Sequence, residues 1–219
     1  MLAFLGGTGP EGKGLAARLA MAGEEIIIGS RDAARGAEAA QELLRLVPGS
    51  RIKAEVNFEA AKQADVIFLT VPYEAQSSLL GELRSILTGK ILVNVIAPMR
   101  FQRGRGASAL PVGTGSASEE AHQLLPDSTI VSAFHTVSAV KLGELDKEME
   151  GDVIVCSDDP ESKAFVMNLV RKIPNLRPVD GGALANSRYV EQITPLLVNI
   201  NRIYKIQAGI KITGLNPPS

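Results

Sequence analysis

The chain has 219 residues, of which 45% are hydrophobic, and a formal net charge of −1. This length allows one domain, or one domain and a small second one, with enough apolar residues for a large core. The near-neutral charge gives no attraction to nucleic acid, so we expect no nucleic-acid partner. The single cysteine, Cys156, excludes a disulfide framework and a zinc site built from cysteines.

The N-terminus begins directly with an apolar segment, residues 2–5, that is typical of a strand. It lacks the basic region and the cleavable apolar region of a secretory signal. No apolar run approaches the ~20 residues that a membrane span requires. These patterns predict a cytoplasmic protein without a membrane partner.

The most specific motif is a glycine turn, Gly7-x-Gly9-x-x-Gly12, which follows this strand and precedes an alanine-rich helical stretch, residues 14–22. A strand, a glycine turn and a helix N-terminus form a cradle for a dinucleotide pyrophosphate. The same residues nearly form a triphosphate-binding loop, but Gly14 stands where a hydroxyl is needed to hold magnesium. We therefore favour a dinucleotide-binding turn over a triphosphate-binding loop and over an ordinary tight turn that binds no ligand.

The next expected strand, residues 25–29, ends in Ser30-Arg31 rather than in the acid that binds the ribose 2′-hydroxyl of NAD. A hydroxyl and a guanidinium suit a 2′-phosphate. Arg35 lies one helical turn further on if Asp32 is the N-cap of a helix, as we interpret it. The pattern favours NADP over NAD; the alternative is that both arginines belong to a solvated helix start.

The rest of the chain alternates strands and helices, which predicts an α/β fold with a doubly wound, Rossmann-type parallel sheet. Strands are expected at residues 51–56, 65–71, 90–96, 129–134, 152–156 and 177–179, and helices at 33–46, 57–64, 75–87, 118–125 and 160–173. Asn57 is the expected cap of its helix. Residues 97–117 are expected to be irregular, and their Arg100, Arg103 and Arg105 either meet phosphates or lie in a mobile solvated loop.

Two domains are expected, a Rossmann-type NADP-binding domain over residues 1–180 and a small, mostly helical C-terminal region over residues 181–219. The stretch 186–209 is too apolar to stand alone, so it packs on the sheet or on a second subunit. Pro195 should kink a helix there or start a new one.

The carboxyl ends of parallel strands should ring one crevice, where ligands bind in folds of this class. The expected rim consists of Val71, Tyr73, Ile96, Ala97, His135, Thr136, Val137 and Ser138. No Ser-His-Asp order, acid pair or metal-ligand spacing occurs, so we expect neither a catalytic side chain nor a metal. Hydride transfer between two ring cofactors needs little from side chains, because the protein has only to hold the rings together and exclude water.

The chain resembles the F420-dependent NADP reductase family (NADPH:coenzyme F420 oxidoreductases) over nearly its whole length. The motifs that carry the resemblance are Gly6-Gly7-Thr8-Gly9 with Gly12-Lys13-Gly14, Gly29-Ser30-Arg31, Ser132-Ala133-Phe134-His135-Thr136, Asn186-Ser187-Arg188 and Thr194-Pro195-Leu196. The resemblance implies hydride transfer between the nicotinamide C4 of NADP(H) and C5 of the deazaflavin coenzyme F420. It also implies a homodimer whose C-terminal part shapes the deazaflavin site.

The resemblance further implies residue roles. Thr8, Gly9, Pro10 and Glu11 would line the pyrophosphate turn, Ser30, Arg31 and Arg35 would hold the 2′-phosphate, and His135, Thr136, Val137 and Ser138 would flank the deazaflavin. Val137-Ser138 replace a frequent Ile-Pro-type segment, and Tyr73 replaces a common tryptophan. Because both departures touch the crevice, they leave room for a different acceptor, so an NADPH-dependent reductase of another flavin or a ferric chelate stays open as an alternative. A non-catalytic NADP-binding module is the other alternative.

Overall fold

The computed structural model describes residues 1–215; the end of the predicted C-terminal region, residues 216–219, lies outside them. Its centre is a six-stranded sheet in which all neighbouring strands are parallel. The strands lie in the order β3 (Arg51–Val56), β2 (Glu25–Ser30), β1 (Leu2–Leu5), β4 (Val66–Leu69), β5 (Ile91–Asn94) and β8 (Thr129–Ser132). This order, which reverses between β1 and β4, confirms the predicted doubly wound fold.

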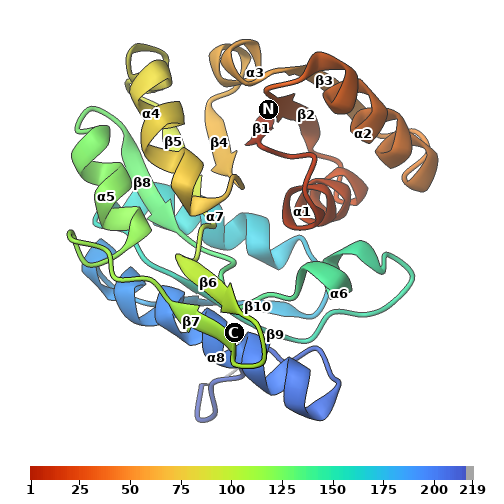
Figure 1. Cartoon of the computed structure of the whole chain (residues 1–219). Coiled ribbons are helices and arrows are strands. Elements are labelled where there is room, and N and C mark those ends of the chain that lie inside the picture. The colour runs from red at the N-terminus through yellow and green to blue at the C-terminus, as the bar shows by residue number, and fades with distance from the viewer. Residues whose placement is uncertain (216–219) are drawn as a thin grey trace.

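Helices cover both faces of the sheet (Figure 1). One face packs against α1 (Pro10–Met21), α2 (Ala33–Leu46), α6 (Ala139–Gly143) and α7 (Pro160–Arg171). The other face packs against α3 (Asn57–Gln63), α4 (Tyr73–Leu87) and α5 (Ala117–Leu124). Because both faces are covered, the central strands are continuous apolar runs rather than alternating ones.

The central strand β1 shows how the two cores are built. Successive side chains of a strand point to opposite faces, so Leu2 and Phe4 enter one core while Ala3 and Leu5 enter the other. The ring of Phe4 stacks on that of Phe68 in β4, with 4.6 Å between ring centroids. This packing fixes β1 beside β4, where the strand order reverses.

The segment predicted to be irregular, residues 97–117, contains a hairpin. Strands β6 (Met99–Gln102) and β7 (Gly106–Ala109) pair antiparallel. Asn199, in α8 (Ser187–Tyr204), accepts a hydrogen bond from the backbone N–H of Ala107 at 2.9 Å and donates one to its carbonyl at 2.8 Å. The prediction was wrong because the partner that orders this hairpin lies 92 residues away in the sequence.

The C-terminal part differs from the prediction in two ways. Strands β9 (Gly151–Val155) and β10 (Leu176–Asp180) form a separate two-stranded parallel sheet. Helix α8, which follows the short 3-10 helix η1 (Leu184–Asn186), continues through Pro195 to Tyr204, so the prediction of a new helix at this proline is wrong. Val190 and Pro195 are both buried. Their packing stabilises the helix where Pro195 lacks the backbone N–H that would donate a helical hydrogen bond.

The two predicted helix caps have different outcomes. The carboxylate of Asp32 accepts hydrogen bonds from the N–H groups of Ala34 and Arg35 at 2.9 and 3.2 Å, which confirms it as the N-cap of α2. Asn57 does not cap α3, because its Oδ1 instead faces the N–H of Gly6, 3.4 Å away. Among the helices of residues 1–215, none combines the length and the apolar character needed to cross a bilayer.

Candidate functional site

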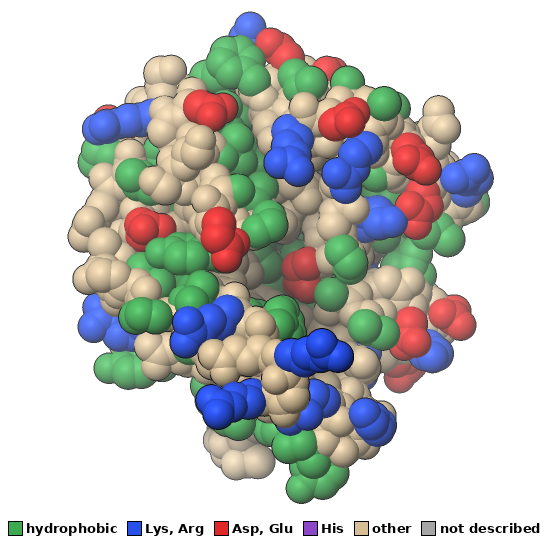
Figure 2. Space-filling view, viewed as in Figure 1, with side chains coloured by type: hydrophobic (Ala, Val, Ile, Leu, Met, Phe, Trp, Pro, Cys, Tyr) green, Lys and Arg blue, Asp and Glu red, His purple; other side chains and the backbone are tan. Residues whose placement is uncertain are grey.

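Two cavities open at the carboxyl ends of the parallel strands, and Glu11 lines both of them. The larger, of about 930 Å³, lies at the glycine turn, and the smaller, of about 350 Å³, lies between the end of β8 and α8. Figure 2 shows the hollow that results near the middle of this face of the molecule. Two ligands that fill these cavities would meet beside Glu11.

The glycine turn forms the wall of the larger cavity beside β1. The N–H of Gly7 donates to the carbonyls of Phe4 and Gly29 at 3.1 and 3.0 Å, which closes the turn over the strand ends. A Cβ on Gly12 would lie 2.7 Å from the Cα of Gly7, so this glycine permits α1 to approach the turn. A Cβ on Gly9 would have no neighbour closer than 3.9 Å and would occupy the cavity itself.

The residues predicted to bind the 2′-phosphate lie at the far end of the larger cavity. Ser30, Arg31 and Arg35 all line it, and both arginines are exposed. Neither arginine forms an ion pair with any carboxylate in the described part of the chain. The nearby acid, Asp32, is occupied as the cap of α2. The two guanidinium groups at this end of the cavity are therefore not ion-paired with a carboxylate of the described residues.

The structure brings most of the predicted site residues to the two cavities. The larger is lined by Thr8, Gly9, Pro10, Glu11, Ser30, Arg31, Arg35 and Val71, and the smaller by Glu11, Ala97, His135, Thr136, Val137 and Ser138. Four predicted residues line neither cavity: Gly7, Gly12, Tyr73 and Ile96.

Each of these four has an identifiable structural position. Gly7 and Gly12 form the contact between the turn and α1, and Ile96 is buried in the core. The hydroxyl of Tyr73 donates to Glu120 Oε1 at 3.3 Å and so points toward α5. Lys13, which follows the glycine turn in α1, pairs with Glu42 at 2.7 Å.

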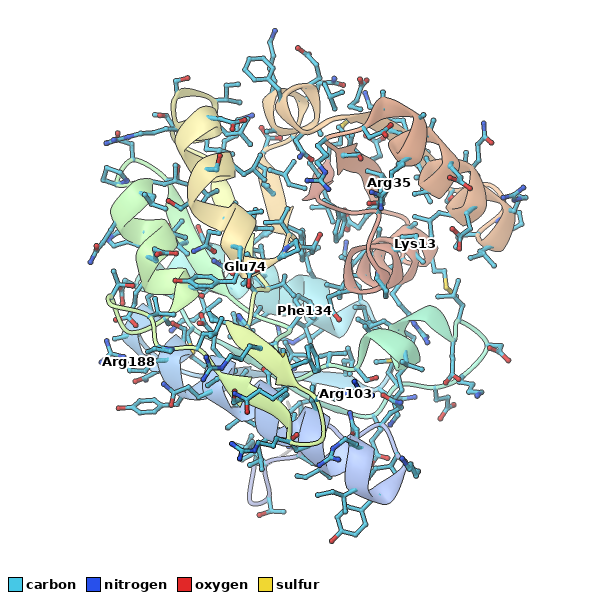
Figure 3. All side chains as sticks on the ribbon, in the orientation of Figure 1. Lys13, Arg35, Glu74, Arg103, Phe134 and Arg188 are labelled. Carbon is cyan, nitrogen blue, oxygen red and sulfur yellow. The ribbon has the colours of Figure 1, made fainter. Side chains whose placement is uncertain are left out.

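The smaller cavity is mostly apolar and is built from the chain after β8 and from α8. Phe134, at the turn, has a φ of +69°, a conformation that is unusual for a non-glycine residue and that redirects the chain toward the cavity. Thr194 of α8 lines the cavity and donates from Oγ1 to the carbonyl of His135 at 2.9 Å. Figure 3 shows Phe134 between Arg35 on the α2 side and Arg103 on the hairpin side.

His135 is buried at the wall of the smaller cavity. Burial lowers its pKa to about 3, so the imidazole is neutral at physiological pH. Neither Nδ1 nor Nε2 has a hydrogen-bond partner within residues 1–215, and Oε1 of Glu191 lies 3.9 Å from Nε2. A neutral imidazole has one donor and one acceptor, and the backbone of Ile96 lies close enough to the ring to oppose the effect of burial on its pKa.

Glu11 stands at the junction of the two cavities, in the first turn of α1. Burial raises its pKa to about 8, so the carboxyl group is largely protonated at neutral pH. Its Oε1 is buried without a hydrogen-bond partner in the described residues. A protonated carboxyl at this junction offers a hydrogen-bond donor and does not repel an anionic ligand as a carboxylate would.

Several lining residues were absent from the sequence prediction. Asn57 and Phe58 line the larger cavity, and Met99, Asn201 and Gln207 line the smaller one. Asn57 was recognised only as a helix start. The other residues belong to segments without a motif, and only their tertiary position brings them to the cavities.

A buried acid on α8 connects this helix to the rest of the site. Glu191 accepts hydrogen bonds from the N–H groups of Ala117 and Ser118 at 2.8 and 3.1 Å, and from the Ser118 hydroxyl at 2.7 Å. These groups form the N-terminus of α5, which favours a negative charge, but burial outweighs them and raises the pKa of Glu191 to about 7. The contact holds α8 in the position where it closes the smaller cavity.

Comparisons with known proteins agree with this site. Residues 1–98 match the family described as NADP oxidoreductase, coenzyme F420-dependent. The chain is 40% identical over 220 residues to the F420-dependent NADP reductase of Methanothermobacter marburgensis, with 98% of each chain covered. It is also 33% identical over 189 residues to Metalloreductase STEAP3 of Rattus norvegicus, covering 85% of this chain and 35% of that one.

A solved structure shares the fold over almost the whole chain. It is a protein of Arthrobacter sp. FB24, crystallised as a candidate F420-dependent NADP reductase, and it superposes with a TM-score of 0.83 at 24% identity. The superposition covers 97% of this chain and 98% of that one. Together with the 40% identity over 98% of each chain to the Methanothermobacter enzyme, these findings place the protein in a defined family. The chain belongs to the family of F420-dependent NADP reductases.

Proposed function

We propose that the protein is an oxidoreductase that transfers a hydride between NADP(H) and the deazaflavin coenzyme F420. The observation that carries the proposal is the meeting of the two cavities at Glu11, one beside the glycine turn and one beside His135. The nicotinamide C4 and the deazaflavin C5 supply the chemistry when both cofactors are bound. The protein contributes position, since the reacting atoms must approach within about 3–3.5 Å.

The residues of the larger cavity fit NADP(H). The glycine turn and the N-terminus of α1 offer backbone N–H groups to the pyrophosphate, and Gly9 leaves room for it. Arg31 and Arg35 have no competing carboxylate, so their guanidinium groups are free to bind a 2′-phosphate. Protonated Glu11 can donate a hydrogen bond to a carbonyl or phosphate oxygen of the same ligand.

The residues of the smaller cavity fit a flat, mostly apolar ring. Val137, Leu197 and Val198 line it with apolar atoms that exclude water. Buried, neutral His135 supplies hydrogen-bonding groups that fix the orientation of a ring edge. No group in this wall needs to titrate, which suits a hydride transfer that takes its chemistry from the two cofactors.

The direct test is an absorbance assay with purified protein, NADPH and oxidised F420. Loss of the deazaflavin absorbance near the edge of the visible range, at a rate proportional to protein, is the expected result. Binding of both cofactors without loss of absorbance would contradict the proposal and would favour a non-catalytic NADP-binding module.

A second candidate is an NADPH-dependent reductase of another flavin or of a ferric chelate. The 33% identity to a metalloreductase over 85% of this chain favours it. This candidate predicts faster turnover of FMN or ferric citrate than of F420 under the same conditions. The assay above, run with the three acceptors at equal concentration, separates the two.

The proposal includes a homodimer, the absence of a nucleic-acid partner and a division near residue 180 into an NADP-binding domain and a C-terminal region. The exposed apolar side chains of α8 support the dimer, and the contacts of α8 with the smaller cavity support a role of the C-terminal region in the deazaflavin site. Measurement of the molecular mass in solution tests the dimer.

A further inference from the structure

Two long segments of the chain contain basic residues and no acidic ones. Residues 83–118 and residues 192–219 include no Asp or Glu, although the whole chain has 24 acidic and 23 basic side chains. The first segment contains Arg100, Arg103 and Arg105, and the second contains Arg202 and Lys205. We refer to these five side chains as the basic rim. Such segregation of charge is a feature that the hydride-transfer site does not explain.

The fold brings the two segments together. The hairpin β6–β7 carries the three arginines, and the paired hydrogen bonds between Asn199 and Ala107 fix it on α8. A Cβ on Gly106 would lie 3.3 Å from Nε of Arg202, so the end of α8 lies directly against the hairpin. Figure 2 shows Lys and Arg side chains gathered below the central hollow, over this hairpin and α8, and Figure 3 places Arg103 on the hairpin.

The basic rim has no counter-charge from the protein. All five side chains are exposed, and none forms an ion pair with a carboxylate in residues 1–215. Other cations of the molecule are paired, for example Lys163 with Asp180 and Arg177 with Asp152, both at 2.7 Å. Like charges that gather without partners repel each other and attract an external anion.

The segments that carry the basic rim also contribute residues to the smaller cavity. Met99, at the start of β6, lines this cavity and is followed by Arg100. Asn201 lines it from α8 and is followed by Arg202, while Gln207 lines it two residues after Lys205. A ligand whose ring fills the cavity would therefore extend any substituent toward the two segments that carry these cations, the hairpin β6–β7 and the end of α8.

We propose that the basic rim binds the anionic side chain of the deazaflavin, a phosphodiester that continues into carboxylates. This inference rests on the proposed function, because it takes the deazaflavin ring as the occupant of the smaller cavity. Arginine forks suit both phosphate and carboxylate oxygens. The rim thus adds affinity for the coenzyme without touching the ring that accepts the hydride. It is separate from Arg31 and Arg35, the residues proposed to bind the 2′-phosphate of NADP(H).

The test compares two ligands by the change in deazaflavin fluorescence on binding: F420 and the same deazaflavin truncated to its ribityl group. The double variant Arg103→Ala/Arg105→Ala should raise the Kd for F420 by roughly 2- to 30-fold, since each exposed charge contact contributes about 0.2–1 kcal/mol. The Kd values for the truncated deazaflavin and for NADPH should stay unchanged. Added salt should weaken F420 binding to the unmodified protein far more than binding of the truncated ligand.

Two further variants serve as controls. Arg103→Lys/Arg105→Lys keeps the charges and should bind F420 nearly as well as the unmodified protein. Arg45→Ala removes another exposed arginine, in the last turn of α2, that has no ion pair in the described residues, and it should change neither Kd.

Three results would overturn the inference in distinguishable ways. Equal weakening of both deazaflavins by the double alanine variant would show that the arginines act on the ring or on the fold. Equal affinity of the unmodified protein for F420 and for the truncated deazaflavin would refute the role of the basic rim and leave the proposed function intact. Failure of the unmodified protein to bind either deazaflavin would reject the proposed function, and the role of the rim with it.

Discussion

We expect charge at single residues to determine which dinucleotide the larger cavity accepts. Arg31 and Arg35 are exposed, and the carboxylate of Asp32 is held by two N–H groups of α2, so it does not neutralise them. We expect these two cations, which form no ion pair in the described residues, to face the position where NAD carries a hydroxyl and NADP carries a phosphate.

Replacing Arg31 by alanine should weaken NADPH binding much more than NADH binding. The lost charge-assisted contact should cost about 1–2 kcal/mol, or roughly 5- to 30-fold in Kd, because the side chain is exposed and its interaction is partly screened. Titration followed by the fluorescence of the reduced nucleotide, or calorimetry with each nucleotide, measures both values. Equal losses for the two nucleotides would contradict the assigned role.

Glu11 should make the stability of the protein depend on pH. Burial raises its pKa to about 8, whereas in the unfolded chain it ionises near the ordinary value of 4.5. Between these values the folded protein retains a proton that the unfolded chain has released, so stability falls as pH rises through this window. The effect is absent below about pH 4.5 and complete above about pH 8.

The variant Glu11→Gln keeps the shape and the hydrogen-bonding capacity of the protonated acid but does not titrate. It should be more stable than the unmodified protein at pH 8, by about 1–3 kcal/mol, and equally stable near pH 5. Urea unfolding at several pH values measures the difference. A difference that stays constant between pH 5 and pH 8 would show that Glu11 is not protonated in the folded state.

At the scale of elements, two glycines of the same turn have different roles, one in the packing of α1 and one in the binding of the dinucleotide. Gly12 lies where α1 meets the turn, and Gly9 lies where the turn meets the cavity. The two positions therefore offer a matched pair of substitutions, each of which adds a single methyl group.

Gly12→Ala should destabilise the fold, whereas Gly9→Ala should leave stability unchanged and abolish dinucleotide binding. The added Cβ at position 12 would lie 2.7 Å from Gly7 Cα and 2.8 Å from Thr70 Oγ1, so α1 must shift, at a cost of about 1–3 kcal/mol. At position 9 the nearest atom is 3.9 Å away and φ is −78°, which alanine adopts freely. Thermal unfolding and NADPH titration of both variants measure the two effects, and equal stability losses would contradict the separation.

The elements that could be predicted from the sequence are those with local signals. Each of these signals is contained in a few neighbouring residues: the apolar run of β4, the start of α2 with its cap at Asp32, and the glycine turn. Each lies where it was expected. Because parallel strands end at a common edge, the placement of His135 and the glycine turn at the same edge of the sheet also followed from the element order, although they line two cavities that share Glu11 rather than the single crevice expected.

The parts that could not be predicted depend on contacts between distant segments. The hairpin β6–β7 is fixed by Asn199, and the position of α8 depends on Glu191 at the start of α5. Asn57 was assigned as a cap because asparagine favours that position, but the N–H of Gly6 competes for its side chain. Local propensity gives no information on such competition.

At the scale of the whole molecule, α8 connects the site to the proposed subunit interface. Leu197, Val198 and Asn201 line the smaller cavity from this helix. On another face of the same helix, Tyr189, Leu196 and Ile203 are 64%, 58% and 63% exposed. Their spacing of seven residues places them in one apolar stripe, as in helices that pair with a second helix. A second copy of the chain that covers this stripe would also brace the helix that closes the deazaflavin cavity.

The double variant Leu196→Asp/Ile203→Asp should convert the dimer into a monomer, because it places two carboxylates in the proposed apolar contact. Light scattering coupled to size-exclusion chromatography measures the mass, and Leu46→Asp, at an apolar side chain of α2 that is 55% exposed, serves as the control. The unmodified protein and the control should both be dimers at micromolar concentration. Since the stripe braces α8, the monomeric variant should also bind the deazaflavin more weakly while its affinity for NADPH, whose cavity has no residue from α8, stays the same. A monomeric unmodified protein, or a double variant that remains dimeric, would show that the stripe is not the interface.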